Sequence, residues 1–218
     1  SEAGFVPAFF MGINAKRLKK DILLHFKDNN KKFLQESSIK ISDLLKNKKL
    51  KNIIFFNYTP RLNKFLNWNQ QLIAESLGKN GKGFFPVISE APKDHHSLLQ
   101  LYLDGPKDKF FYIFSDNLAN NKRSRLSAKN LHPKLRFLKN KNLSQIKRAQ
   151  RDSFVNILKK KQIPYREFKI KSFKEETIGE LFSYFMLETA IVGKLSNVNP
   201  FDQPAVEQVK KETKDYLT

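Results

Sequence analysis

The chain has 218 residues, no cysteine and a formal net charge of +20 at pH 7. This length favours one domain with its own core, while the lack of cysteine excludes disulfides and thiolate metal sites and fits a reducing compartment. No stretch approaches the roughly 20 uninterrupted apolar residues of a membrane span, and residues 1–4 lack the basic residues of a signal peptide. We therefore expect a cytoplasmic protein.

The excess of positive charge has more than one interpretation. A basic surface attracts polyanions, so a basic nucleic-acid-binding module is one candidate. Lysine, however, greatly outnumbers arginine and is dispersed over segments such as 46–51 and 159–161, while Lys, Asn, Phe and Ile are enriched together. Arginine is the residue best suited to bidentate recognition of phosphates and bases. We therefore favour compositional drift over nucleic-acid binding, with mild steering of phosphorylated substrates as a further alternative.

Hydrophobic periodicity and turn residues predict helices that alternate with short strands. In chain order, we expect helices over residues 2–12, 14–28 and 31–47, a strand over 52–58, a helix over 60–78, a strand over 84–89, a helix over 94–103, a strand over 109–114, a loop or insertion over 118–140, a helix over 143–161, a strand over 165–170, and helices over 173–193 and from 204 onward.

Local signals support several of these boundaries. Thr59 followed by Pro60 is typical of an N-cap and a first helical residue, and Ser172 with Glu175 is typical of a capping box. The alternation of strands and helices predicts an α/β fold, with a doubly wound, mostly parallel sheet that has helices on both faces. Residues 200–218 add a C-terminal helical extension.

Three short segments contain residues suited to acid–base chemistry. In chain order they are Gln70-Gln71-Leu72-Ile73-Ala74-Glu75-Ser76-Leu77-Gly78-Lys79-Asn80-Gly81-Lys82-Gly83, Asp94-His95-His96-Ser97-Leu98-Leu99-Gln100-Leu101-Tyr102-Leu103-Asp104-Gly105 and Asn199-Pro200-Phe201-Asp202-Gln203-Pro204-Ala205-Val206-Glu207-Gln208-Val209-Lys210. They resemble, in the same order, the catalytic-glutamate region, the catalytic-histidine helix and the C-terminal signature of the phosphoglucose isomerase family. Members of this family interconvert glucose 6-phosphate and fructose 6-phosphate.

The resemblance implies a role for five residues. Glu75 is the carboxylate base that moves a proton between C1 and C2 through an enediol, and Gln71, one helical turn earlier, contacts the substrate. His96 opens the sugar ring, which suits an imidazole because its unperturbed pKa is about 6.5. Lys210 handles a proton or stabilises charge at the ring. Gln203 binds the substrate, and we expect it to share a helix face with Lys210 because the two are two turns apart.

Two other patterns do not carry a site. Adjacent residues on a helix point about 100° apart, so His95 and His96 do not form a metal site without further ligands. Gly78, Gly81 and Gly83 follow a helix rather than opening one, which does not fit a nucleotide-binding loop. We expect neither a metal nor another cofactor.

The family also has an N-terminal phosphate-binding sugar-isomerase (SIS) domain and an arginine that have no counterpart here. We therefore expect residues 1–218 to be the second, C-terminal SIS domain of a larger isomerase. Alone it should be inactive or nearly so, because the phosphate anchor and charge stabilisation are missing. The resemblance implies a homodimer in which the neighbouring subunit supplies the histidine. A non-catalytic SIS domain that binds a sugar phosphate is the alternative, but it should have lost one of Glu75, His96 and Lys210.

Overall fold

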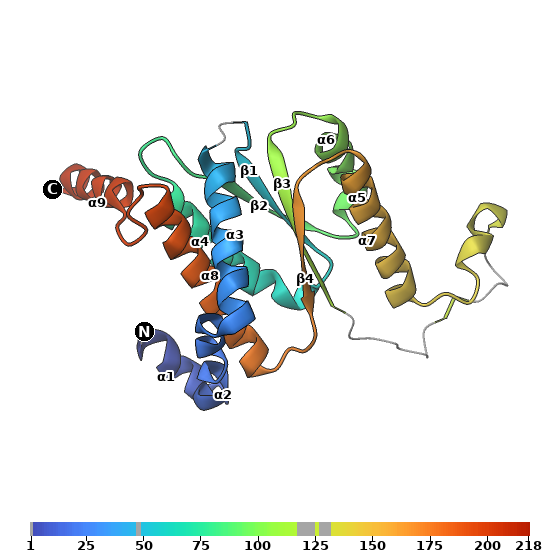
Figure 1. The fold of residues 1–218 in the computed structure, drawn as a ribbon, viewed down its shortest axis with the longest axis horizontal. Coiled ribbons are helices and arrows are strands. Elements are labelled where there is room, and N and C mark those ends of the chain that lie inside the picture. The colour runs from blue at the N-terminus through green and yellow to red at the C-terminus, as the bar shows by residue number, and fades with distance from the viewer. Residues whose placement is uncertain (1, 47–48, 117–124, 127–131) are drawn as a thin grey trace. The chain divides into compact units, whose positions relative to one another are not determined.

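A computed structural model describes residues 2–46, 49–116, 125–126 and 132–218 (Figure 1). The helices are α1 (Glu2–Phe10), α2 (Ala15–Lys19), α3 (Asp28–Lys46), α4 (Asn63–Leu77), α5 (Asp94–Ser97), α6 (Leu99–Asp104), α7 (Leu143–Lys160), α8 (Glu175–Leu195) and α9 (Pro204–Leu217). The strands are β1 (Asn52–Asn57), β2 (Phe85–Glu90), β3 (Lys109–Asp116) and β4 (Tyr165–Ile170). Short 3₁₀ helices are η1 (Ile22–Phe26), η2 (Pro60–Leu62) and η3 (Pro133–Leu138).

The chain divides into two compact units. The first comprises residues 1–52, 65–86 and 173–218, and the second comprises residues 53–64 and 87–172. The first unit is mainly helical, whereas the second contains most of the sheet together with α5, α6 and α7.

The four strands form one parallel sheet in the order β2-β1-β3-β4. In the β3–β4 pair, Phe111 lies opposite Tyr165 and Asp116 lies opposite Ile170. The chain therefore runs outward from β1 to β2, crosses back to β3 and continues outward to β4, which is the doubly wound order. This confirms the predicted α/β class and parallel sheet.

The two central strands, β1 and β3, have consecutive buried residues on both of their faces. All residues of β1 after Asn52 are buried, and so are the first seven residues of β3. Strands covered on both faces have near-continuous apolar runs rather than alternating ones. Aromatic side chains of these strands contribute to the core of the second unit. There the ring centroids of Phe56 and of Phe154 on α7 are 4.6 Å apart.

In the first unit, α8 packs against α2 and α3. Phe182 of α8 also contacts α4 through Phe65 and Trp68, with ring centroids 5.2 and 4.4 Å away. The contact with α2 requires glycine, because a Cβ atom at Gly179 would lie 1.8 Å from the carbonyl oxygen of Leu18.

Several predicted boundaries are wrong in detail. Pro60 begins the 3₁₀ turn η2 rather than an α-helix, and the Thr59 side chain makes no capping hydrogen bond. The Asn57 side chain bonds both backbone groups of Thr59 instead, accepting from its N–H (2.9 Å) and donating to its carbonyl oxygen (3.0 Å), which holds Thr59 at the start of this turn. The N-cap of α8 is Lys174, not Ser172.

Two predicted helices are interrupted. The helix expected over residues 14–28 consists of α2 and η1, and the helix expected over 94–103 is broken at Leu98 into α5 and α6. About half of the predicted loop 118–140 lies outside the described residues, and in the described part residues 133–138 form η3. None of the described helices is long and apolar enough to cross a membrane.

Candidate active site

Three of the five predicted site residues meet in the first unit. The Glu75 carboxylate accepts a hydrogen bond from Gln71 Nε2 at Oε1 and another from Gln203 Nε2 at Oε2, both 2.9 Å long. Gln71 and Glu75 lie one turn apart on α4, whereas Gln203 comes from a segment 128 residues later. Because an ionised carboxylate only accepts, both amides present their NH₂ groups to it. Each carboxylate oxygen therefore has its own amide donor.

Lys79, in the loop after α4, holds the segment that carries Gln203. The Lys79 ammonium donates to the carbonyl oxygen of Asn199 and forms an ion pair with Asp202 Oδ1 at 3.0 Å. The Asn199 side chain closes the turn, donating to Asp202 Oδ2 (2.9 Å) and accepting from the N–H of Phe201 (3.1 Å). The Lys79 hydrogen bond lowers the pKa of Asp202. Asn199, Asp202 and Lys79 thus position Gln203, a role that motif matching alone did not reveal.

Within the described residues, Lys210 forms no hydrogen bond or ion pair with these three side chains. It is exposed on α9, and its ammonium binds Glu207 Oε1 at 2.6 Å. The prediction that Gln203 and Lys210 share a helix face is wrong, because α9 begins at Pro204 and Gln203 is its non-helical N-cap, with φ −142° and ψ 59°. The proline at the first helical position decides where this helix begins.

His96 lies in the second unit, on the single helical turn α5, and is exposed. Asp94 positions this turn: its Oδ2 accepts from Ser89 Oγ (2.8 Å) and from the N–H of Glu90 (2.7 Å), and its Oδ1 accepts from Ser97 Oγ (2.9 Å). The side chain of Asp94 therefore ties α5 to the end of β2.

The neighbouring His95 has a different environment. Its Nε2 lies 2.6 Å from the hydroxyl of Tyr58, and its ring packs against Phe56 and Phe154. Burial lowers the pKa of His95 and raises the pKa of Tyr58. The tautomer of His95 decides whether the Tyr58 hydroxyl donates to Nε2 or accepts from it. Among the described residues, no group of three or more His, Cys, Asp or Glu side chains could hold a metal ion.

Replacing Asp94 by alanine should lower the free energy of unfolding by about 1–3 kcal/mol, because the fully buried Ser89 hydroxyl and the Glu90 N–H lose their acceptor. Burial alone would raise the pKa of Asp94, but its hydrogen bonds from Ser89, Glu90 and Ser97 outweigh burial and lower it. A carboxyl whose pKa is lower in the folded state stabilises the fold above its unfolded pKa, about 3.9, and loses this effect as the pH falls through the folded value.

The measurement is urea denaturation of wild type and variant at neutral and acidic pH. The difference in unfolding free energy should shrink as the pH drops below about 4. Asp104→Ala is the matched control, because this carboxylate is exposed and its hydrogen bond within the described residues comes from Gln100 of the same helix. A loss from Asp94→Ala no larger than that of the control would contradict the positioning role of Asp94.

Comparison with curated proteins identifies relatives along most of the chain. The chain is 36% identical over 197 residues to a probable glucose-6-phosphate isomerase of Methanococcus maripaludis. This alignment covers 84% of the chain and 44% of that protein. It is 33% identical to a glucose-6-phosphate isomerase of Mycoplasmopsis synoviae, covering 95% of this chain and 50% of that protein. The chain thus spans about half the length of the curated relatives it matches. No family model matches the chain.

Solved structures share the fold. A hypothetical protein from Thermus thermophilus superposes with a TM-score of 0.83 and 26% identity, covering 100% of this chain and 54% of that one. A glucose-6-phosphate isomerase from Chlamydia trachomatis has a TM-score of 0.72 at 15% identity, covering 92% of this chain and 41% of that one, and so supports the fold alone. With the identity to the curated relatives, which confirms the resemblance seen in the three segments, the chain belongs to the glucose-6-phosphate isomerase family.

Proposed function

We propose that residues 1–218 form the second, C-terminal SIS domain of a cytoplasmic glucose-6-phosphate isomerase, with residues 200–218 as a helical extension. Relatives with this activity in their names match the chain along most of its length and are about twice as long. The observation that carries the assignment of the site is the hydrogen bond of Gln203 to Glu75, which joins two of the resembling segments across 128 residues.

In this proposal Glu75 is the base. Its carboxylate removes the proton from C2 of the open-chain glucose 6-phosphate, which leaves an enediolate with its negative charge on the C1 oxygen. After the hydroxyl proton moves from the C2 oxygen to the C1 oxygen, the Glu75 carboxyl returns its proton to C1 to give fructose 6-phosphate. Two amide donors hold the carboxylate in one orientation, so that little reorganisation is needed when the substrate binds. Glu75 is half-buried, which leaves it accessible to a substrate.

The two glutamines serve the substrate as well as the base. Each amide that donates to Glu75 also has a carbonyl oxygen, which can accept a hydrogen bond from a sugar hydroxyl. Gln71 and Gln203 are exposed, which is compatible with direct contact to a ligand. We propose that they bind the sugar hydroxyls next to the reacting carbons.

The remaining groups act in the assembled protein. We propose that His96 opens the sugar ring and that it is supplied to the active site by the neighbouring subunit of a homodimer. Its exposure on α5 is compatible with such an arrangement. Lys210 is proposed to handle a proton or to stabilise charge at the ring, which requires its ammonium to exchange Glu207 for the substrate.

The chain alone should not catalyse the reaction. We propose that phosphate binding and charge stabilisation come from the part of the relatives that this chain does not match. Oxyanion-type stabilisation contributes about 10²–10³-fold for a single donor, and positioning contributes further.

The test is to assay glucose 6-phosphate isomerisation by the 218-residue chain and by the protein that the complete open reading frame encodes. We expect turnover only from the complete protein. Absence of activity from a folded complete protein would favour a non-catalytic sugar-phosphate-binding domain. Turnover by the isolated chain would contradict the requirement for the other half.

A further inference from the structure

The doubly wound sheet has a switch point between β1 and β3. The chain leaves β1 toward β2 on one side, while β3 and β4 lie on the other side. In open α/β sheets, ligands bind outside the carboxyl ends of the strands at this point. Tyr58 directly follows β1, and Ser115 and Asp116 end β3. All three line a cavity at this edge of the sheet, within the second unit.

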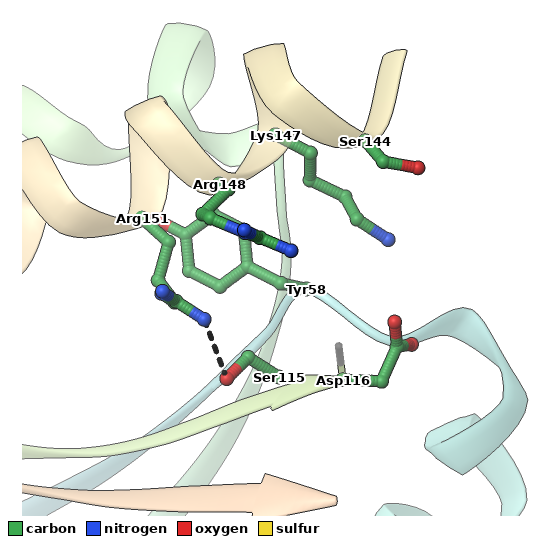
Figure 2. Close-up of a pocket in the computed structure, with 7 residues that line it drawn as sticks. All are labelled: Tyr58, Ser115, Asp116, Ser144, Lys147, Arg148 and Arg151. Carbon is green, nitrogen blue, oxygen red and sulfur yellow. Dashed lines mark hydrogen bonds between the residues drawn. The ribbon is translucent and has the colours of Figure 1, made fainter. Parts of the chain in front are cut away.

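One face of α7 lines the cavity with hydroxyl and basic groups. Ser144, Lys147, Arg148 and Arg151 follow one another at intervals of three, one and three residues, so they lie on one side of the helix. Figure 2 shows the side chains of Lys147, Arg148 and Arg151 directed from α7 toward the ends of the strands. The first turn of α7 contains no acidic residue, so the positive end of its dipole adds to the positive field.

Arg151 is the buried part of this cluster, with only 9% of its surface exposed. Its Nη1 group donates to Ser115 Oγ at 3.3 Å, while Nε and Nη2 donate to Asp152 Oδ1 at 2.9 and 2.6 Å. Because the Ser115 hydroxyl oxygen accepts from Arg151, its own proton is available to a ligand in the cavity. The Tyr58 hydroxyl is bound to His95, so Tyr58 contributes its ring as a wall.

The balance of charge favours an anion. The lining contains three cations, Lys147, Arg148 and Arg151, and one carboxylate, Asp116. Asp152 offsets part of the charge of Arg151, but within the described residues neither Lys147 nor Arg148 forms an ion pair. The cavity measures about 40 Å³. Since one water needs about 10–15 Å³ on this scale, the space suits a group the size of a phosphate and not a hexose ring.

We propose that this cavity binds a phosphate group, either as inorganic phosphate or as the terminal group of a sugar phosphate whose sugar remains outside. Arg148 and Lys147 supply the cationic contacts, and the Ser115 and Ser144 hydroxyls donate to the phosphate oxygens. This site goes beyond the proposed isomerase function, because it uses none of the residues assigned to catalysis.

The test is titration of the 218-residue chain with inorganic phosphate and, separately, with glucose 6-phosphate, followed by the amide NMR signals of Ser115 and Ser144. We expect both ligands to shift these signals, and Arg148→Gln and Lys147→Gln each to raise the dissociation constant at least about tenfold, as for the loss of one charge-assisted hydrogen bond. If inorganic phosphate binds more tightly, the ligand is the free ion. If glucose 6-phosphate binds more tightly, the ligand is the phosphate monoester.

Lys160→Gln is the matched control, because it removes one exposed positive charge from the other end of the same helix. It should leave the dissociation constant within about twofold, as expected for a screened, distant charge. If Lys160→Gln and Arg148→Gln weakened phosphate binding equally, the site would be overturned in favour of non-specific attraction to a chain of charge +20. Absence of binding at millimolar phosphate would overturn it too. Glu75→Gln should not affect phosphate binding, so the two proposals fail separately.

Discussion

Glu75→Gln in the complete protein should lower kcat for glucose 6-phosphate isomerisation by about 10²–10⁴-fold, the range typical of a positioned acid–base group. The substitution keeps the size of the side chain and removes the carboxylate that takes the C2 proton. KM should change less, because both glutamines can still bind the new side chain once one of them turns its carbonyl oxygen toward the NH₂ group that replaces a carboxylate oxygen. The measurement is steady-state kinetics of the wild type and the variant.

Glu36→Gln provides the comparison, since Glu36 is an exposed residue of α3 with the same chemistry. It should retain the activity of the wild type. Unchanged circular dichroism of Glu75→Gln would show that the loss is chemical rather than structural. If Glu75→Gln and Glu36→Gln were equally active, the base would have to be another residue, although the isomerase function would remain.

Phe56→Ala should lower the free energy of unfolding by about 3–5 kcal/mol, the range observed when a buried phenylalanine is truncated. Phe56 is fully buried, and its ring packs against those of Phe154, Tyr58 and Tyr102 at centroid distances of 4.6, 5.5 and 6.1 Å. Removing it leaves a cavity among rigid rings that cannot collapse easily. Urea denaturation followed by circular dichroism measures the loss.

Phe85→Ala is the matched substitution at an exposed position, since Phe85 on β2 is 69% exposed. It should change the unfolding free energy by no more than about 0.5 kcal/mol, as is usual at the surface. If Phe56→Ala does not fold, Phe56→Leu should still show a loss that exceeds this value. Similar effects of the Phe56 and Phe85 substitutions would show that the ring cluster around Phe56 is not the main core of the second unit.

Much of the fold follows from local patterns. The apolar runs of β1 and β3 identify buried strands without any knowledge of their neighbours, because few other arrangements cover so many consecutive apolar side chains. Pro204 predicts the start of α9, since proline suits the first turn and no later one. The order of the strands does not follow from these patterns, because nothing local states on which side of β1 each later strand adds.

The ends of other elements depend on distant or competing hydrogen bonds. Thr59 and Ser172 are typical capping residues, yet the Thr59 side chain makes no capping hydrogen bond and α8 begins after Lys174. A capping pattern describes what a side chain can do, whereas the surrounding groups decide which of its possible partners it meets. The same holds for Leu98, where a continuous helical pattern is broken into α5 and α6.

For the site, the sequence by itself identified the candidate residues: Glu75 and the two glutamines, His96 and the motif that carries Lys210. Only the tertiary structure decided that Gln71 and Gln203 bind the same carboxylate, that Lys79 holds the turn before Gln203, and that Lys210 pairs with Glu207. It alone also decided that Arg151 is buried beside Ser115 at the end of β3. The physical reason is that local patterns describe a residue's preferences, whereas hydrogen bonds and charge pairs between segments depend on how the chain folds back on itself.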